Sequence, residues 1–245
     1  MRNPSRSARM LVTPRRSSGN DLILATILAF IAGAANAGGF FALGQYTSHM
    51  TGYMSFLADN IAIANLWIAA VSALAIGAFV VGAGFSAILI NWARNHAVRR
   101  QYALPIAVQG GFLACFAAGG LLNGEVGRLF ALACLCFIMG MQNATVAKIS
   151  GARIRTTHAT GMVTDIGIEL GRAVYGRLQP GDAVAADRIK LRILLQLVGA
   201  FVLGGILGAI GYGMVGFLFS LPLAAVLLAL GLPDMIGHFS RASRP

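Results

Sequence analysis

Long apolar segments make up most of this chain and most strongly constrain its fold. Six runs each reach about 18 residues or more, which lets a helix cross the roughly 30 Å hydrocarbon core of a bilayer. Only 11% of the residues are charged and the mean hydropathy is +0.75, whereas soluble domains carry about 25% charged residues. We therefore expect an all-α polytopic membrane protein in contact with the lipid bilayer. Its six predicted transmembrane helices are residues 21–43, 66–93, 103–123, 127–147, 190–212 and 214–232.

The positions of the basic residues predict the orientation of these spans, because inner loops carry an excess of Lys and Arg. With six spans and an inner N-terminus, 18 of the 19 Lys and Arg residues lie inside and only Arg128 lies outside. Eight crossings would leave 13 inside and 6 outside. Both termini are therefore predicted to be cytoplasmic. The net charge of +11 is dispersed among the loops without an aromatic and basic recognition pattern, so we expect no nucleic acid partner.

The two ends of the chain are polar. Residues 1–20 are basic and rich in Ser, which predicts a disordered cytoplasmic arm, and residues 233–245 are predicted to form a cytoplasmic tail. An alternative for the N-terminal region is a cleavable signal peptide, because an apolar stretch follows the basic arm and ends at Ala35-Asn36-Ala37. The internal repeat favours the first interpretation.

Three pairs of similar segments recur in the same order in the two halves of the chain. They are FIAGAANA at 30–37 with FIMGMQNA at 137–144, TSHMTG at 47–52 with TTHATG at 156–161, and GAFVVG at 77–82 with GAFVLG at 199–204. The polar matches carry most of the weight, because apolar matches are frequent in a chain rich in Gly, Ala and Val. The sequence therefore predicts two repeats, residues 21–123 and 124–232.

Each repeat contains three predicted crossings, an odd number, so the second repeat must enter the membrane from the opposite side. The distribution of charges indicates the same inversion independently. Inverted 3+3 repeats are common among secondary transporters, whose solute sites lie between the two repeats.

A short segment follows each polar segment, at residues 51–64 and 160–176. Fourteen helical residues extend only about 21 Å, too short for a crossing. We expect each to be a half-helix, capped at its first turn by Ser48 or Thr51 and by Thr157 or Thr160. A helix N-terminus inside the membrane would offer N–H groups to an anion or a carbonyl oxygen.

The candidate solute-binding residues are polar or small groups in and around these segments. They are Asn36, Ser48, His49, Thr51, Gly52, Gln142, Asn143, Thr157, His158, Thr160 and Gly161. Two alternatives remain for them: the hydroxyls and imidazoles cap interfacial helices, and the amides join neighbouring helices by hydrogen bonds.

Three carboxylates are candidates for proton or ion coupling: Asp59, Asp165 and Glu169. Asp165 and Glu169 share one helical face. Arg172, three residues after Glu169, offers an ion pair as the alternative role.

Enzymatic motifs are absent from the sequence, which contains no HExxH, GxSxG or P-loop pattern. We therefore expect no enzyme, no cofactor and no metal site. Cys115, Cys134 and Cys136 lie within apolar runs without ligand spacing, and we interpret them as packing residues.

The sequence around Ser48 to Gly52, together with GMQNA at 140–144 and TTHATG, resembles the YoaK family of bacterial membrane proteins, a domain of unknown function. The resemblance extends over about residues 21–232 and implies a six-span protein of the bacterial inner membrane. Two positions depart from the family pattern, which usually has Asp in place of Asn36 and Asn in place of Tyr53. A proton-linked or cation-linked role for position 36 is therefore doubtful in this chain.

The favoured hypothesis is a transporter or facilitator for a small polar or anionic solute that binds between the repeats. The alternatives are a narrow channel, and a membrane-embedded enzyme or accessory protein. The small-residue stripes Ala73 with Gly77 and Gly204 with Gly208 suggest packing within a subunit or in a homo-oligomer.

Overall fold

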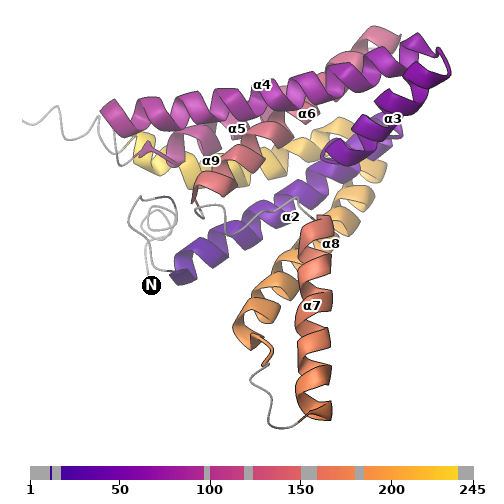
Figure 1. Cartoon of the computed structure of the whole chain (residues 1–245). Coiled ribbons are helices and arrows are strands. Elements are labelled where there is room, and N and C mark those ends of the chain that lie inside the picture. The colour runs from indigo at the N-terminus through magenta and orange to yellow at the C-terminus, as the bar shows by residue number, and fades with distance from the viewer. Residues whose placement is uncertain are drawn as a thin grey trace, which may run out of the picture.

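Helices form nearly all of the described chain. The structure, a computed structural model, describes residues 12, 18–96, 100–118, 124–149, 159–179 and 185–236, and these residues include no strand. Figure 1 labels α2 (Ser18–Leu43), α3 (Met50–Ala62), α4 (Leu66–His96), α5 (Ala103–Ala117), α6 (Gly124–Ile149), α7 (Ala159–Leu178), α8 (Arg188–Val215) and α9 (Ser220–Ile236). A 3₁₀ turn, η3 (Gly216–Phe219), joins the last two helices. The expected all-α class is confirmed for the described residues.

Four helical stretches in the described residues are long and apolar enough to cross a membrane: Gly19–Phe41, Leu66–His96, Gly124–Lys148 and Arg188–Pro233. The last has 46 residues and contains α8, η3 and α9. The fifth apolar helix, α5, is shorter. The chain is therefore a helical membrane protein, and length and hydropathy give four candidate spans where the sequence predicted six.

The break between α8 and α9 lies later than predicted. The sequence placed it near residue 213, but α8 continues to Val215, and Gly216 then adopts a φ of 60°, which costs glycine little. Contacts across the break hold the turn: the Tyr212 and Ser220 hydroxyls are 2.8 Å apart, and the Tyr212 ring meets Phe219 edge-on at 5.3 Å between centroids.

Close crossings join helices that are distant in sequence, and glycines lie at two of them. Where α2 packs along α8, a Cβ atom on Gly33 or Gly204 would come within 3.0 Å of the carbonyl oxygen of Phe201 or Phe30, respectively. A side chain at either glycine would therefore push the two backbones apart. Small residues allow such close approach between membrane helices.

The pairing of α4 with α6 has the same construction (Figure 1). Here a Cβ atom on Gly82 or Gly140 would come within 3.0 Å of the carbonyl oxygen of Phe137 or Phe79. These positions correspond to those of the first crossing: Gly140 follows Gly33 by 107 residues, and Gly204 follows Gly82 by 122 residues.

Helix α3, with 13 residues, and helix α7, which at 20 residues is longer than the half-helix predicted at 160–176, are docked by matching apolar clusters. One cluster includes Tyr53 of α3 with Ala75, Leu132 and Cys136. A second cluster contains the residues at the corresponding positions of the other half: Met162 of α7 with Leu197, Ala25 and Ala29. Helix α3 thus packs on α4, which follows it, and on α6, the first long helix of the other half. In the same way α7 packs on α8 and on α2. In Figure 1 the turn between α3 and α4 lies at the upper right, and α7 points toward the bottom of the view.

One residue of the N-terminal arm belongs to the core. Val12 is fully buried among residues of the main apolar cluster, which includes Leu24, Leu28 and Leu227. Val12 is therefore held in the core, and α2 already begins at Ser18. At the other end, α9 continues to Ile236, and residues 237–245 lie outside the described part.

Candidate functional site

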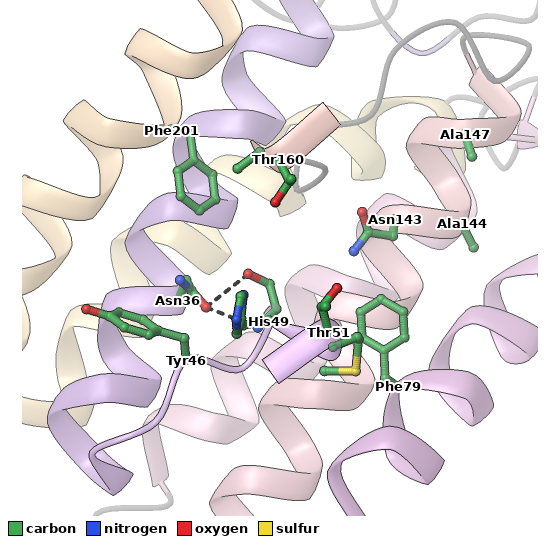
Figure 2. A pocket seen from close by; sticks show the side chains of 13 residues that line it. Asn36, Tyr46, His49, Thr51, Phe79, Asn143, Ala144, Ala147, Thr160 and Phe201 are labelled. Atoms are coloured by element: carbon green, nitrogen blue, oxygen red, sulfur yellow. Dashed lines mark hydrogen bonds between the residues drawn. The ribbon is translucent and has the colours of Figure 1, made fainter. Parts of the chain in front are cut away.

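A cavity of about 850 Å³ lies where α3 and α7 begin. Its lining comes from α2, the loop before α3, and helices α3, α4, α6, α7 and α8. The lining residues are Asn36, Tyr46, Ser48, His49, Met50, Thr51, Phe79, Asn143, Ala144, Ala147, Ala159, Thr160 and Phe201. Six candidates from the sequence therefore meet in one place: Asn36, Ser48, His49, Thr51, Asn143 and Thr160 (Figure 2).

Much of the lining consists of residues at corresponding positions of the two halves. The pairs are Asn36 with Asn143, Met50 with Ala159, Thr51 with Thr160, and Phe79 with Phe201. Their separations of 107, 109, 109 and 122 residues equal those of the matched sequence segments. In Figure 2, Asn36 lies across the same space from Asn143, Thr51 from Thr160, and Phe79 from Phe201. The cavity therefore lies where the two halves of the chain meet.

Asn36 connects α2 to the start of α3. Its Oδ1 accepts hydrogen bonds of 3.0 Å from both the backbone N–H and the hydroxyl of Ser48. Because a backbone N–H can only donate, these bonds fix which end of the amide is the oxygen. Asn36 Nδ2 remains, and it donates no hydrogen bond to another described residue.

His49 occupies the N-cap position of α3, and its side chain makes no capping hydrogen bond. The predicted cap at Ser48 or Thr51 is wrong, because the Ser48 hydroxyl donates to Asn36 and the Thr51 hydroxyl makes no hydrogen bond with another described residue. The imidazole lies over Gly52, where a Cβ atom would come within 3.0 Å of the ring. Gly52 therefore contributes by leaving room for His49, and it is not among the residues that line the cavity.

The first turns of α3 and α7 both open on the cavity, through Met50 and Thr51 and through Ala159 and Thr160. Backbone N–H groups in a first helical turn lack intrahelical acceptors, and the helix dipole makes this end positive by roughly half a charge. Two such ends face one space. Their combined field favours a negative charge or a carbonyl oxygen there.

Gln142 does not line the cavity, contrary to its inclusion among the candidates. Its side chain is fully buried between helices, where Nε2 donates to the carbonyl oxygen of Leu28 and Oε1 accepts from Gln109 at 2.7 Å. Consecutive helical residues point about 100° apart, so Gln142 faces α2 and α5 while Asn143 faces the cavity. Gln142 thus joins helices, the alternative role considered for the amides.

The three carboxylate candidates also lie outside the residues that line the cavity. Asp59 is exposed on α3. Glu169 is fully buried, 3.0 Å from Arg172 and 3.6 Å from Lys190, and Asp165 lies 3.4 Å from the same Lys190. The backbone N–H of Asp187, the N-cap of α8, donates to Glu169 at 2.9 Å. This ion cluster joins α7 to α8, in agreement with the ion-pair alternative.

Two candidates, Thr157 and His158, lie outside the described residues. Gly161 is exposed on α7 and does not appear in the cavity lining.

Sequence reasoning missed the aromatic part of the lining. Phe79 and Phe201 lie on opposite sides of the cavity in Figure 2. They belong to the GAFVVG and GAFVLG segments, whose match is a weak signal by itself because apolar matches are common in this chain. Their equivalent positions in the repeat were the signal that could have identified them.

Among the described residues, no group of three or more His, Cys, Asp or Glu side chains is placed to hold a metal ion. Cys115, Cys134 and Cys136 are free thiols. Cys136 is buried in the cluster that docks α3, as expected for a packing residue.

A family model described as a protein of unknown function, DUF1275, matches residues 24–232. The chain belongs to this family. The match confirms the resemblance to YoaK-like membrane proteins, which are DUF1275 members. It extends from α2 to α9 and contains every described residue that lines the cavity of this DUF1275 chain. No curated protein and no solved structure matches the chain significantly.

Proposed function

We propose that this DUF1275 member is a transporter or facilitator of the bacterial inner membrane that moves a small polar or anionic solute through the cavity between its two halves. The observation that carries the proposal is the lining itself. Residues at corresponding positions of the two halves, Asn36 with Asn143 and Thr51 with Thr160, surround one space. Transporters built from inverted repeats place their solute sites in such a position.

The proposed topology has six crossings, with both termini in the cytoplasm and the second half inverted relative to the first. Three observations support it: the charge distribution, the corresponding glycine crossings, and the matching clusters that dock α3 and α7. In this topology α5 crosses as the third span, and the chain turns back at η3 so that α8 and α9 cross separately.

Alternating access is the mechanism that this architecture favours. From one cavity, α3 extends toward the upper right of Figure 1 and α7 toward the bottom. Small movements of one half against the other would therefore open the same cavity to one side and then to the other. At the glycine crossings backbone faces backbone without an intervening side chain. We expect α2 to slide against α8, and α4 against α6, at these contacts.

Counterflow in proteoliposomes tests the proposal. The purified protein is reconstituted, the vesicles are loaded with unlabelled candidate solute, and a trace of labelled solute is added outside. A transporter gives transient accumulation that saturates with solute concentration, and the Thr51→Val with Thr160→Val double variant should reduce it. Linear, non-saturating flux would indicate a channel, and absence of flux for a solute that binds would contradict transport.

Sided labelling tests the topology separately. In a variant without the three native cysteines, Arg128→Cys should react with an impermeant thiol reagent added to intact cells. Arg94→Cys should react only after the membrane is permeabilised. The reverse pattern would contradict the proposed orientation.

A further inference from the structure

The described lining of the cavity contains no Asp, Glu, Lys or Arg side chain. A cation entering this cavity would lose its hydration without gaining a carboxylate partner. Cation sites in membrane proteins depend on such partners or on carbonyl oxygens.

Hydrogen-bond donors in the lining are available to a solute. Asn36 Nδ2, the Thr51 hydroxyl and the His49 ring make no hydrogen bond with another described residue, although all three groups belong to residues that line the cavity. The amide can only donate at Nδ2, because its oxygen is held by Ser48. The first turns of α3 and α7 add N–H groups and a positive dipole end from each half.

Apart from Tyr46, Ser48, Asn143 and Thr160, the remaining lining is apolar. Phe79 and Phe201 face the cavity from opposite sides (Figure 2), and the lining also includes Met50, Ala144 and Ala147. An inorganic anion has no apolar surface to bury against such walls. The volume of about 850 Å³ lies within the roughly 300–1,000 Å³ typical of pockets for small organic molecules.

From these three observations we infer that the solute is a small organic carboxylate with an apolar body. Its carboxylate is bound by the donors at the starts of α3 and α7 and by Asn36, and its apolar body lies between Phe79 and Phe201. The inference rests on the proposed function, because it names the solute class of the same cavity.

A matched series of probes tests the inference by calorimetric binding to the detergent-purified full chain. The probes are benzoate, hexanoate and phenylacetate as apolar carboxylates, benzamide as the neutral isostere, benzylammonium as the cation, and formate as a carboxylate without an apolar body. We expect at least one apolar carboxylate to bind about tenfold more tightly than benzamide, benzylammonium or formate. Equal binding of benzamide or benzylammonium would overturn the anionic assignment, and equal binding of formate would overturn the apolar one. Failure of all three apolar carboxylates to bind would overturn both.

Two variants separate the parts of the site. Phe79→Ala with Phe201→Ala should reduce the preference for benzoate over formate, whereas Thr51→Val should reduce the preference for benzoate over benzamide. Thermal unfolding and gel filtration establish that each variant is folded. An unchanged preference in both folded variants would contradict the inference.

Binding and counterflow results distinguish this inference from the proposed function. If apolar carboxylates bind but show no counterflow, transport is contradicted and the carboxylate site stands. If a neutral solute shows saturable counterflow and carboxylates do not bind, transport stands and the carboxylate assignment is overturned.

Discussion

The side chain of Asn36 holds Ser48 through two hydrogen bonds to one oxygen atom, each 3.0 Å long. This contact fixes the loop between α2 and α3 and leaves the amide nitrogen of Asn36 as a donor beside the cavity. The residue thus combines a structural contact with a position in the proposed site, and two substitutions can separate the two roles.

Asn36→Asp should preserve the fold and abolish carboxylate binding. A carboxylate at position 36 can still accept both hydrogen bonds from Ser48, but it adds a negative charge to the cavity. Asn36→Ala, by contrast, should lower the free energy of unfolding by about 1–2 kcal/mol, because the Ser48 N–H loses its acceptor. Thermal unfolding and calorimetric binding in detergent measure the two effects. Wild-type carboxylate affinity in Asn36→Asp would contradict the anionic site.

Gln142 and Asn143 are neighbours with different roles, so their substitution should have different effects. Gln142→Met should lower the free energy of unfolding by about 1–3 kcal/mol, because buried groups at Leu28 and Gln109 lose their partner. It should leave solute affinity unchanged. Asn143→Leu should weaken binding more than it lowers stability. A loss of affinity in a folded Gln142→Met protein would place Gln142 in the site after all.

The crossing glycines should be sensitive to a single methyl group. Gly82→Ala and Gly204→Ala should each lower stability by about 1–3 kcal/mol, because a Cβ atom would meet a facing carbonyl group. Gly77→Ala and Gly199→Ala are matched controls on the same helices, with no described atom within 4 Å of the added Cβ. They should change stability by less than about 0.5 kcal/mol or increase it slightly, because Ala favours helix. Thermal unfolding compares the four variants, and equal losses in all of them would disprove the close crossings.

The position of the His49 ring depends on Gly52. Gly52→Ala should turn the imidazole away from the start of α3 and weaken solute binding to about the same extent as His49→Ala. Adding Gly52→Ala to His49→Ala should weaken solute binding no further, because the ring is already absent. A double-mutant cycle of binding free energies measures this coupling. Additive losses would show that Gly52 acts independently of His49.

The ion cluster between α7 and α8 should affect stability and not ion coupling. Glu169→Ala should lower the free energy of unfolding by about 1–3 kcal/mol, because the Asp187 N–H loses its acceptor and Arg172 and Lys190 lose a partner. Asp59→Asn, at an exposed position of α3, is the control and should be nearly neutral. An imposed pH gradient should change counterflow to the same extent in wild type and in Glu169→Ala. A changed response would assign Glu169 to proton coupling.

The sequence by itself determined the helical membrane class and marked the segment TSHMTG before α3, four of whose residues line the cavity. Apolar runs, repeated polar residues and basic loops are local or additive properties, so they can be recognised without knowing which helices meet.

Only the tertiary structure decided which side chains meet in the cavity. In the structure Asn143 lines the cavity and Gln142 does not, and Phe79 and Phe201 also line it. Glu169 belongs to an ion cluster, and the last helix break lies at Gly216. The physical reason is that lipid and protein interior are both apolar, so hydropathy does not mark which face of a membrane helix is buried. A rotation of about 100° per residue then decides the role of each side chain, and that rotation is set by close packing between distant helices.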